Sequence, residues 1–127
     1  MNYLSKDYTT AIIPSITSDQ KEALQDFLGR HWKIPRVESI CVEHPDLLLA
    51  YGVSSEPARR LVSRTVNSLS WQDEKNMAVV SCHSKGVLSK GEQNRLLSKA
   101  VAHLGEKLPQ AKILGVILDG CSPRIIE

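Results

Sequence analysis

The sequence predicts a single α/β domain built on a mixed β-sheet. Residues 77–82 and 113–118 are continuous apolar runs of strand length, which is typical of parallel strands that helices cover on both faces. A helical pattern lies between them, so this part of the chain is predicted to form a parallel strand–helix–strand unit. The length of 127 residues suits one domain with one hydrophobic core, and we assign residues 1–127 to it.

A first helix is predicted over residues 17–32. Thr17 with Gln20, or Asp19 with Glu22, can form the capping box that starts it. Apolar residues then recur at helical spacing on one side of the segment. This pattern indicates an amphipathic helix that packs on the sheet.

Two strands are predicted in the N-terminal half, a weak one over residues 9–13 and a second over 37–43, where β-branched residues gather. Residues 47–53 fit two structures. They form an apolar run of strand length that can pair with 37–43 in a hairpin, but Asp46 can equally cap a short helix that Gly52 ends. We favour the strand.

Two further helices complete the prediction. Ser54 or Ser55 caps one of them, with Pro57 in its first turn. Ser89 and Glu92 form a capping box for a longer one. The predicted order is therefore β-α-β-β-α-β-α-β, with about three helices flanking the sheet.

Composition narrows the class of protein without identifying it. The formal charge is +2, and three cysteines at irregular spacing do not make a disulfide framework. The apolar runs are too short to cross a bilayer, and Lys6 and Asp7 stand where a signal peptide would place its apolar region. We expect a cytoplasmic protein with reduced thiols and no membrane partner, and no motif indicates a cofactor.

The residues with the most chemical potential follow the first of the two buried strands, in the stretch VVSCHSKG. In open α/β sheets, ligands bind beyond the carboxyl ends of the strands. Cys82, His83 and Lys85 lie at such an end, and Asp119 lies at the same end of the parallel partner strand. If there is an active site, we expect it here, with His83, Asp119 and Cys82 as candidate catalytic residues.

Strand geometry weakens two readings of this stretch. A thiolate at Cys82 would need an imidazole partner, but adjacent strand residues point to opposite faces, so Cys82 and His83 cannot pair within a strand. For zinc, the same two residues would have to join Cys41 and His44, whose spacing fits a strand poorly and lacks a Cys-x-x-Cys pair. We therefore predict no metal site.

Anion binding is a third reading. In SKGVLSKGE, Lys85, Ser89 and Lys90 precede or open a helix whose first turn has free backbone N–H groups. The segment is not a P-loop, because that motif requires GxxxxGK[ST] directly after the strand. These three residues are the candidate ligand-binding residues, and the alternative is that they are turn and surface residues.

Two basic helix faces offer surfaces for a protein or nucleic-acid partner. Arg95, Lys99, His103 and Lys107 recur at every fourth position, along what should be the solvated side of their helix. The segment 46–69, which contains LLLAYGVSSEPARRLVSRTV, resembles a helix-turn-helix with Gly52, Val53 and Ser54 in its turn. This resemblance implies DNA contacts from its second helix, through Arg59, Arg60, Arg64 and Asn67.

The function that the sequence favours is a small non-enzymatic binding or accessory module for a protein or nucleic-acid partner. The alternatives are a hydrolase or transferase that acts on a phosphorylated or nucleotide substrate at the strand ends, and a DNA-binding protein. A small α/β sheet often leaves an edge or face uncovered, so we also expect a homodimer.

Overall fold

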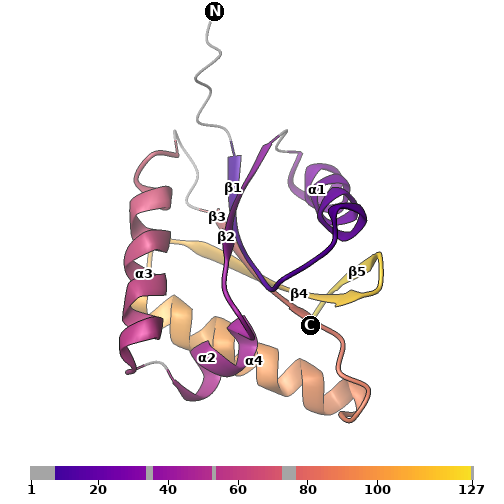
Figure 1. Cartoon of the computed structure of the whole chain (residues 1–127). Coiled ribbons are helices and arrows are strands. Elements are labelled where there is room, and N and C mark those ends of the chain that lie inside the picture. The colour runs from indigo at the N-terminus through magenta and orange to yellow at the C-terminus, as the bar shows by residue number, and fades with distance from the viewer. Residues whose placement is uncertain (1–7, 34–35, 53, 73–76, 127) are drawn as a thin grey trace, which may run out of the picture.

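The computed structural model describes residues 8–33, 36–52, 54–72 and 77–126. They form a single α/β domain with a mixed sheet and helices on both of its faces (Figure 1). The strands are β1 (Tyr8–Ile13), β2 (Arg36–Cys41), β3 (Met77–His83), β4 (Lys112–Asp119) and β5 (Ser122–Ile125). The helices are α1 (Ser18–Trp32), α2 (Pro45–Tyr51), α3 (Glu56–Leu69) and α4 (Lys90–Lys107).

The sheet has the strand order β2-β1-β3-β4-β5, in which the first four strands are parallel and β5 is antiparallel to β4. The parallel unit β3-α4-β4 is thus confirmed. From β1 the chain passes outward to β2 and then returns to β3 on the other side of β1. This reversal makes the carboxyl ends of β1 and β3 the switch point at which open α/β sheets bind ligands.

Helices cover the two faces unequally (Figure 1). On one face, Leu24 and Leu28 of α1 pack against residues of β1, β3 and β4. On the other, Leu49, Leu61 and Leu97 bring α2, α3 and α4 into a second core. Because both faces are covered, β3 and the middle of β4 are buried on both sides, which explains their continuous apolar sequences.

The predicted helix starts are confirmed at atomic detail. Thr17 Oγ1 accepts a hydrogen bond from the Gln20 amide at 3.1 Å, and the Gln20 side chain accepts one from the Thr17 amide. Ser89 and Glu92 form the same reciprocal pair at the start of α4. Ser55 caps α3 by accepting from the Ala58 amide. Each cap satisfies a backbone donor that the helix leaves unpaired.

The predicted strand over 47–53 is wrong, because Pro45–Tyr51 forms the helix α2. Leu49 and Ala50 are buried, whereas Leu47 and Tyr51 lie on the exposed side one helical turn apart. A nearly uniform apolar run conceals this one-sided burial. The helical alternative, ended by Gly52, is the correct one.

Because this segment is helical, it does not form the expected hairpin with β2, which instead pairs with β1 at one edge of the sheet. The helix α2 stands immediately before α3, as the helix-turn-helix pattern requires. Within the expected turn, Val53 lies outside the described residues.

The strand β5 was not predicted. It pairs with β4 through a tight turn at Gly120 and Cys121, and Gly120 has a positive φ of 60°. Only four residues long, with Pro123 in second place, β5 lacks the apolar run that identified the other strands. The Asp119-Gly120 pair, a common hairpin signal, was the available sign of it.

Candidate functional site

His83 bridges the two strand ends that define the switch point. Its Nε2 lies 2.7 Å from the carbonyl oxygen of Ser15, in the loop that follows β1. Two residues earlier, on the same face of β3, Ser81 donates a hydrogen bond to the Ile12 carbonyl at 2.9 Å. Both side chains therefore connect β3 to β1 or to the loop after it. These hydrogen bonds cross the switch point, where a ligand would be expected to bind.

Cys82 faces the other way, as strand geometry predicted. It is buried in the core formed with α2 and α4, with 4% of its surface exposed. Burial raises the pKa of its thiol to about 12, and the neighbouring Asp46 carboxylate contributes further to the rise. The Cys82 side chain is therefore a neutral thiol at neutral pH and lacks the thiolate character of a nucleophile.

Lys85 is engaged by the same carboxylate. Its Nζ forms an ion pair with Asp46 Oδ2, and the two side chains are 22% and 2% exposed. The Lys85 carbonyl accepts a hydrogen bond from Gln93 Nε2 at 2.6 Å. The loop between β3 and α4 is thus fixed to the start of α2 on one side and to α4 on the other.

Asp119 lies at the exposed end of β4. His83 is in register with Leu118, which belongs to the core on the α1 face of the sheet. Because successive strand residues point to opposite faces, Asp119 lies on the face opposite to His83. Among the described residues, no hydrogen bond or ion pair joins Asp119 to His83 or Lys85. The structure places the three residues at one end of the sheet but does not bring them together.

Ser89 and Lys90 are exposed at the start of α4. Ser89 is occupied by the capping box, whose hydrogen bonds lower the pKa of Glu92. An anion at this helix terminus would meet the Glu92 carboxylate in the first turn, which opposes anion binding.

A zinc site has no support in the part of the chain that the structure describes. No cluster of three or more His, Cys, Asp or Glu side chains there has an arrangement that could hold a metal ion. Cys41 is exposed on the edge strand β2, whereas Cys82 is buried under α2 and α4.

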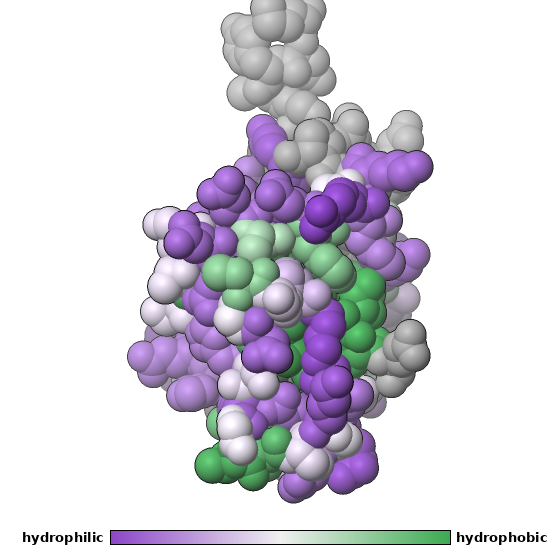
Figure 2. Space-filling model, turned by 90° about the vertical axis from the view of Figure 1, so that its right-hand side faces the viewer, coloured by the Kyte–Doolittle hydropathy of each residue, from purple (hydrophilic) through white to green (hydrophobic). Residues whose placement is uncertain are grey.

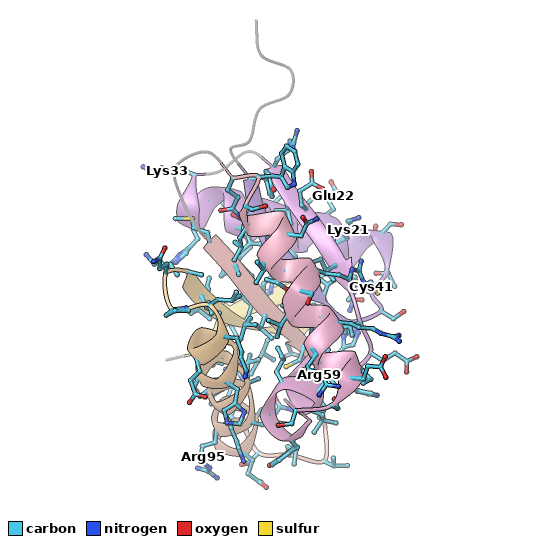
Figure 3. All side chains as sticks on the ribbon, turned by 90° about the vertical axis from the view of Figure 1, so that its left-hand side faces the viewer. Lys21, Glu22, Lys33, Cys41, Arg59 and Arg95 are labelled. Atoms are coloured by element: carbon cyan, nitrogen blue, oxygen red, sulfur yellow. The ribbon has the colours of Figure 1, made fainter. Side chains whose placement is uncertain are left out.

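The outer side of α3 carries the predicted basic residues Arg59, Arg60, Arg64 and Asn67, all of them exposed. Arg60 forms an ion pair with Glu56 one turn earlier, and Arg59 donates to the Ser54 carbonyl at 2.7 Å. A shallow depression of about 570 Å³ lies along this side. Figure 3 shows Arg59 in the lower half of the molecule, the half from which Arg95 of α4 also projects.

The prediction that α4 presents a solvated basic stripe is partly wrong, because α2 packs against that side of the helix. His103 Nδ1 lies 2.8 Å from the Leu49 carbonyl, and the Lys99 ammonium lies 4.5 Å from the centre of the Tyr51 ring. The stripe is therefore interrupted by α2.

Between α2 and α4 runs a groove of about 450 Å³, which the sequence did not predict. We call it the α2–α4 groove; it is lined by Leu47, Tyr51, Leu88, Glu92, Arg95, Leu96 and Lys99. The spacing of Leu47 and Tyr51 was the available signal, since a helix at 45–51 places both on one exposed side.

Exposed apolar side chains accompany the groove. Tyr51 is 70% exposed, and Val87, in the loop before α4, is 92% exposed. Figure 2 shows a hydrophobic area at the lower end of the molecule, on the side where Figure 1 places the loop between β3 and α4. Apolar groups left in water at one place are a common mark of an interaction surface.

No protein-family model, curated protein or solved structure matches the chain. The candidate function therefore rests on the geometry alone. The helices of the described segments include none with the length and apolar character needed to cross a bilayer.

Proposed function

We propose that this chain is a non-enzymatic binding module that docks a partner protein on the surface formed by α2, α3 and α4. One contrast carries the proposal. At the strand ends, His83 and Lys85 are engaged by the fold and Cys82 is buried. On the helices, aromatic, aliphatic and cationic side chains remain exposed beside a groove.

The charge distribution supports the same surface. α3 carries three arginines and one acidic residue, Glu56, and α4 also carries more cations than anions. The whole chain, by comparison, has a formal charge of only +2. Most of the excess positive charge therefore lies on the side of the sheet that α2, α3 and α4 cover. Such a field favours acidic partners and speeds their association.

Site-specific photocrosslinking tests this proposal. A photoreactive phenylalanine analogue replaces Tyr51 in the groove or, as a control, the exposed Glu22 of α1, which lies in the other half of the molecule (Figure 3). In lysate of the source cells, the probe at 51 should give an adduct that nuclease leaves unchanged and that excess unlabelled chain suppresses. Equal labelling from both positions, or no saturable adduct at 51, would overturn the proposal.

DNA binding through α3 is a second candidate. Residues 45–69 contain two successive helices with exposed arginines on the second, the arrangement that the helix-turn-helix resemblance implies. Adducts of the probe-bearing chain whose mass falls on nuclease treatment would favour this candidate over a protein partner.

The enzyme alternative, with a phosphorylated or nucleotide substrate at the strand ends, requires a rearrangement. His83 would have to leave Ser15, and Lys85 would have to leave Asp46, before either could contact a substrate. The contacts of the fold thus favour binding over catalysis.

Cytoplasmic localisation and homodimerisation are further proposals. The strand β2 lies at an edge of the sheet, so one of its sides pairs with no strand of the sheet. It carries an exposed ion pair between Arg36 and Glu38, and charges on an edge strand disfavour the addition of another strand. Sedimentation equilibrium across a hundredfold range of concentration (roughly 1 to 100 μM, spanning moderate affinities) decides whether a dimer forms.

A further inference from the structure

We infer, on the basis of the proposed function, that the α2–α4 groove binds a short acidic amphipathic helix of a partner protein. The groove lies between two helices, which is the arrangement that helix-in-groove recognition uses. Its occupant would place apolar side chains against α2 and carboxylates toward α4.

The apolar component of the groove comes from both walls. Leu47 and Tyr51, one turn apart on α2, are 38% and 70% exposed. Leu88 and Leu96 contribute from the α4 side, with Leu96 at the buried floor. Apolar side chains of a docked helix, spaced three or four residues apart, would remove these groups from water.

The cationic component comes from Arg95 and Lys99, which line the groove on successive turns of α4. Glu92, the acidic residue in the lining, stands at the N-terminal end of α4, so the carboxylates of the occupant are expected opposite Arg95 and Lys99 and away from Glu92. Two cations on one wall match carboxylates placed one turn apart on the occupant. This charge complementarity selects an acidic helix over a basic one.

The dimensions suit a short segment. Glu92 and Lys99 are separated by about two turns of α4, or about 10 Å at 1.5 Å per residue. An occupant of two to three turns, roughly 8 to 12 residues, would span the lining and reach Leu88.

The neighbours of Tyr51 favour a peptide over a nucleic acid. The Lys99 ammonium lies 4.5 Å from the centre of the Tyr51 ring and so covers one aromatic face. Single-stranded nucleic acids bind by stacking bases on open aromatic faces. Beside it, the aliphatic Leu47 suits an apolar side chain better than a base.

Selection from a displayed library of random 12-residue peptides, with the full chain as bait, tests the inference. We expect enriched peptides to combine Leu, Ile or Phe at helical spacing with two or more carboxylates. For one such peptide, synthesised with a fluorophore, Lys99→Glu should weaken binding about tenfold, as expected for reversal of a contacting charge, and Tyr51→Ala should weaken it severalfold. Lys99→Arg should retain binding.

The control is Lys21→Glu, the same charge reversal at an exposed site on α1 (Figure 3), which should leave the affinity unchanged. Thermal unfolding of each variant verifies that it folds. The inference is overturned by absent enrichment, by enriched peptides without carboxylates, by equal effects of Lys99→Glu and Lys21→Glu, or by full competition from a single-stranded oligonucleotide. If crosslinking from position 51 succeeds while the selection fails in one of these ways, the proposed function stands and the acidic helix is wrong.

Discussion

Replacement of Lys85 by methionine is the sharpest test of the claim that the strand-end residues serve the fold. Methionine keeps most of the apolar stem of lysine but removes its ammonium group. It would leave the carboxylate of Asp46, a side chain that is 2% exposed, buried without its cation. An uncompensated buried charge is one of the few defects that strongly destabilise a small domain.

The expected loss of stability follows from the burial of the pair. Removing one partner of a fully buried ion pair costs about 3–5 kcal/mol. Lys85 is 22% exposed, so water already weakens the interaction, and we expect a loss of about 2–3 kcal/mol. At an m-value of about 2 kcal/mol per M, the urea midpoint should fall by about 1–1.5 M.

Urea unfolding of four chains makes the measurement: wild type, Lys85→Met, Asp46→Leu and the double variant. The double variant should be less destabilised than the sum of the single ones, because it removes both charges. Lys90→Met, at an exposed position a few residues away, is the control and should change stability by less than about 0.5 kcal/mol. Equal effects of Lys85→Met and Lys90→Met would refute the structural role of Lys85.

Three other predictions concern reactivity, pH and DNA. N-ethylmaleimide followed by mass spectrometry should label two thiols of the folded chain rapidly and Cys82 only in denaturant, because burial raises its pKa to about 12; fast labelling of Cys82 would show that it is accessible. The pKa of Glu92 is lowered by its capping bonds, so its stabilisation is present above the unfolded pKa of about 4.3 and is lost as pH falls through the folded pKa. The stability difference between wild type and Glu92→Gln should accordingly shrink below about pH 4, and a difference independent of pH would contradict this. If α3 binds duplex DNA, fluorescence anisotropy at low salt should show binding that added salt and Arg60→Glu/Arg64→Glu abolish; no binding of the wild type would eliminate the DNA candidate.

The sequence predicted those parts of the fold that local chemistry determines. Each capping box marks a helix start by two residues three positions apart, as Ser89 and Glu92 do for α4. The buried strands were recognisable as continuous apolar runs, because helices cover both of their faces. The prediction for 47–53 was wrong because a run of leucines indicates burial but does not show which side of the segment is buried. The side of α2 that faces the core is determined by its packing on α4, which lies far along the chain.

The candidate site was predicted less completely, because its contacts are distant in sequence. Lys85 pairs with a residue 39 positions away, and His83 contacts one 68 positions away. Strand alternation correctly separated Cys82 from His83, since that rule is local. The α2–α4 groove depends on how two helices pack, so it emerges only from the structure.

The most direct test of the central claim is to map the partner's binding site by NMR. The ¹⁵N-labelled chain is titrated with the protein captured from position 51, and amide shifts are followed along the sequence. We expect the largest changes in 47–51 and 88–99, with Ser15, His83 and Asp119 unchanged. Changes centred on those three residues would place the function at the strand ends and rule out docking on the helices.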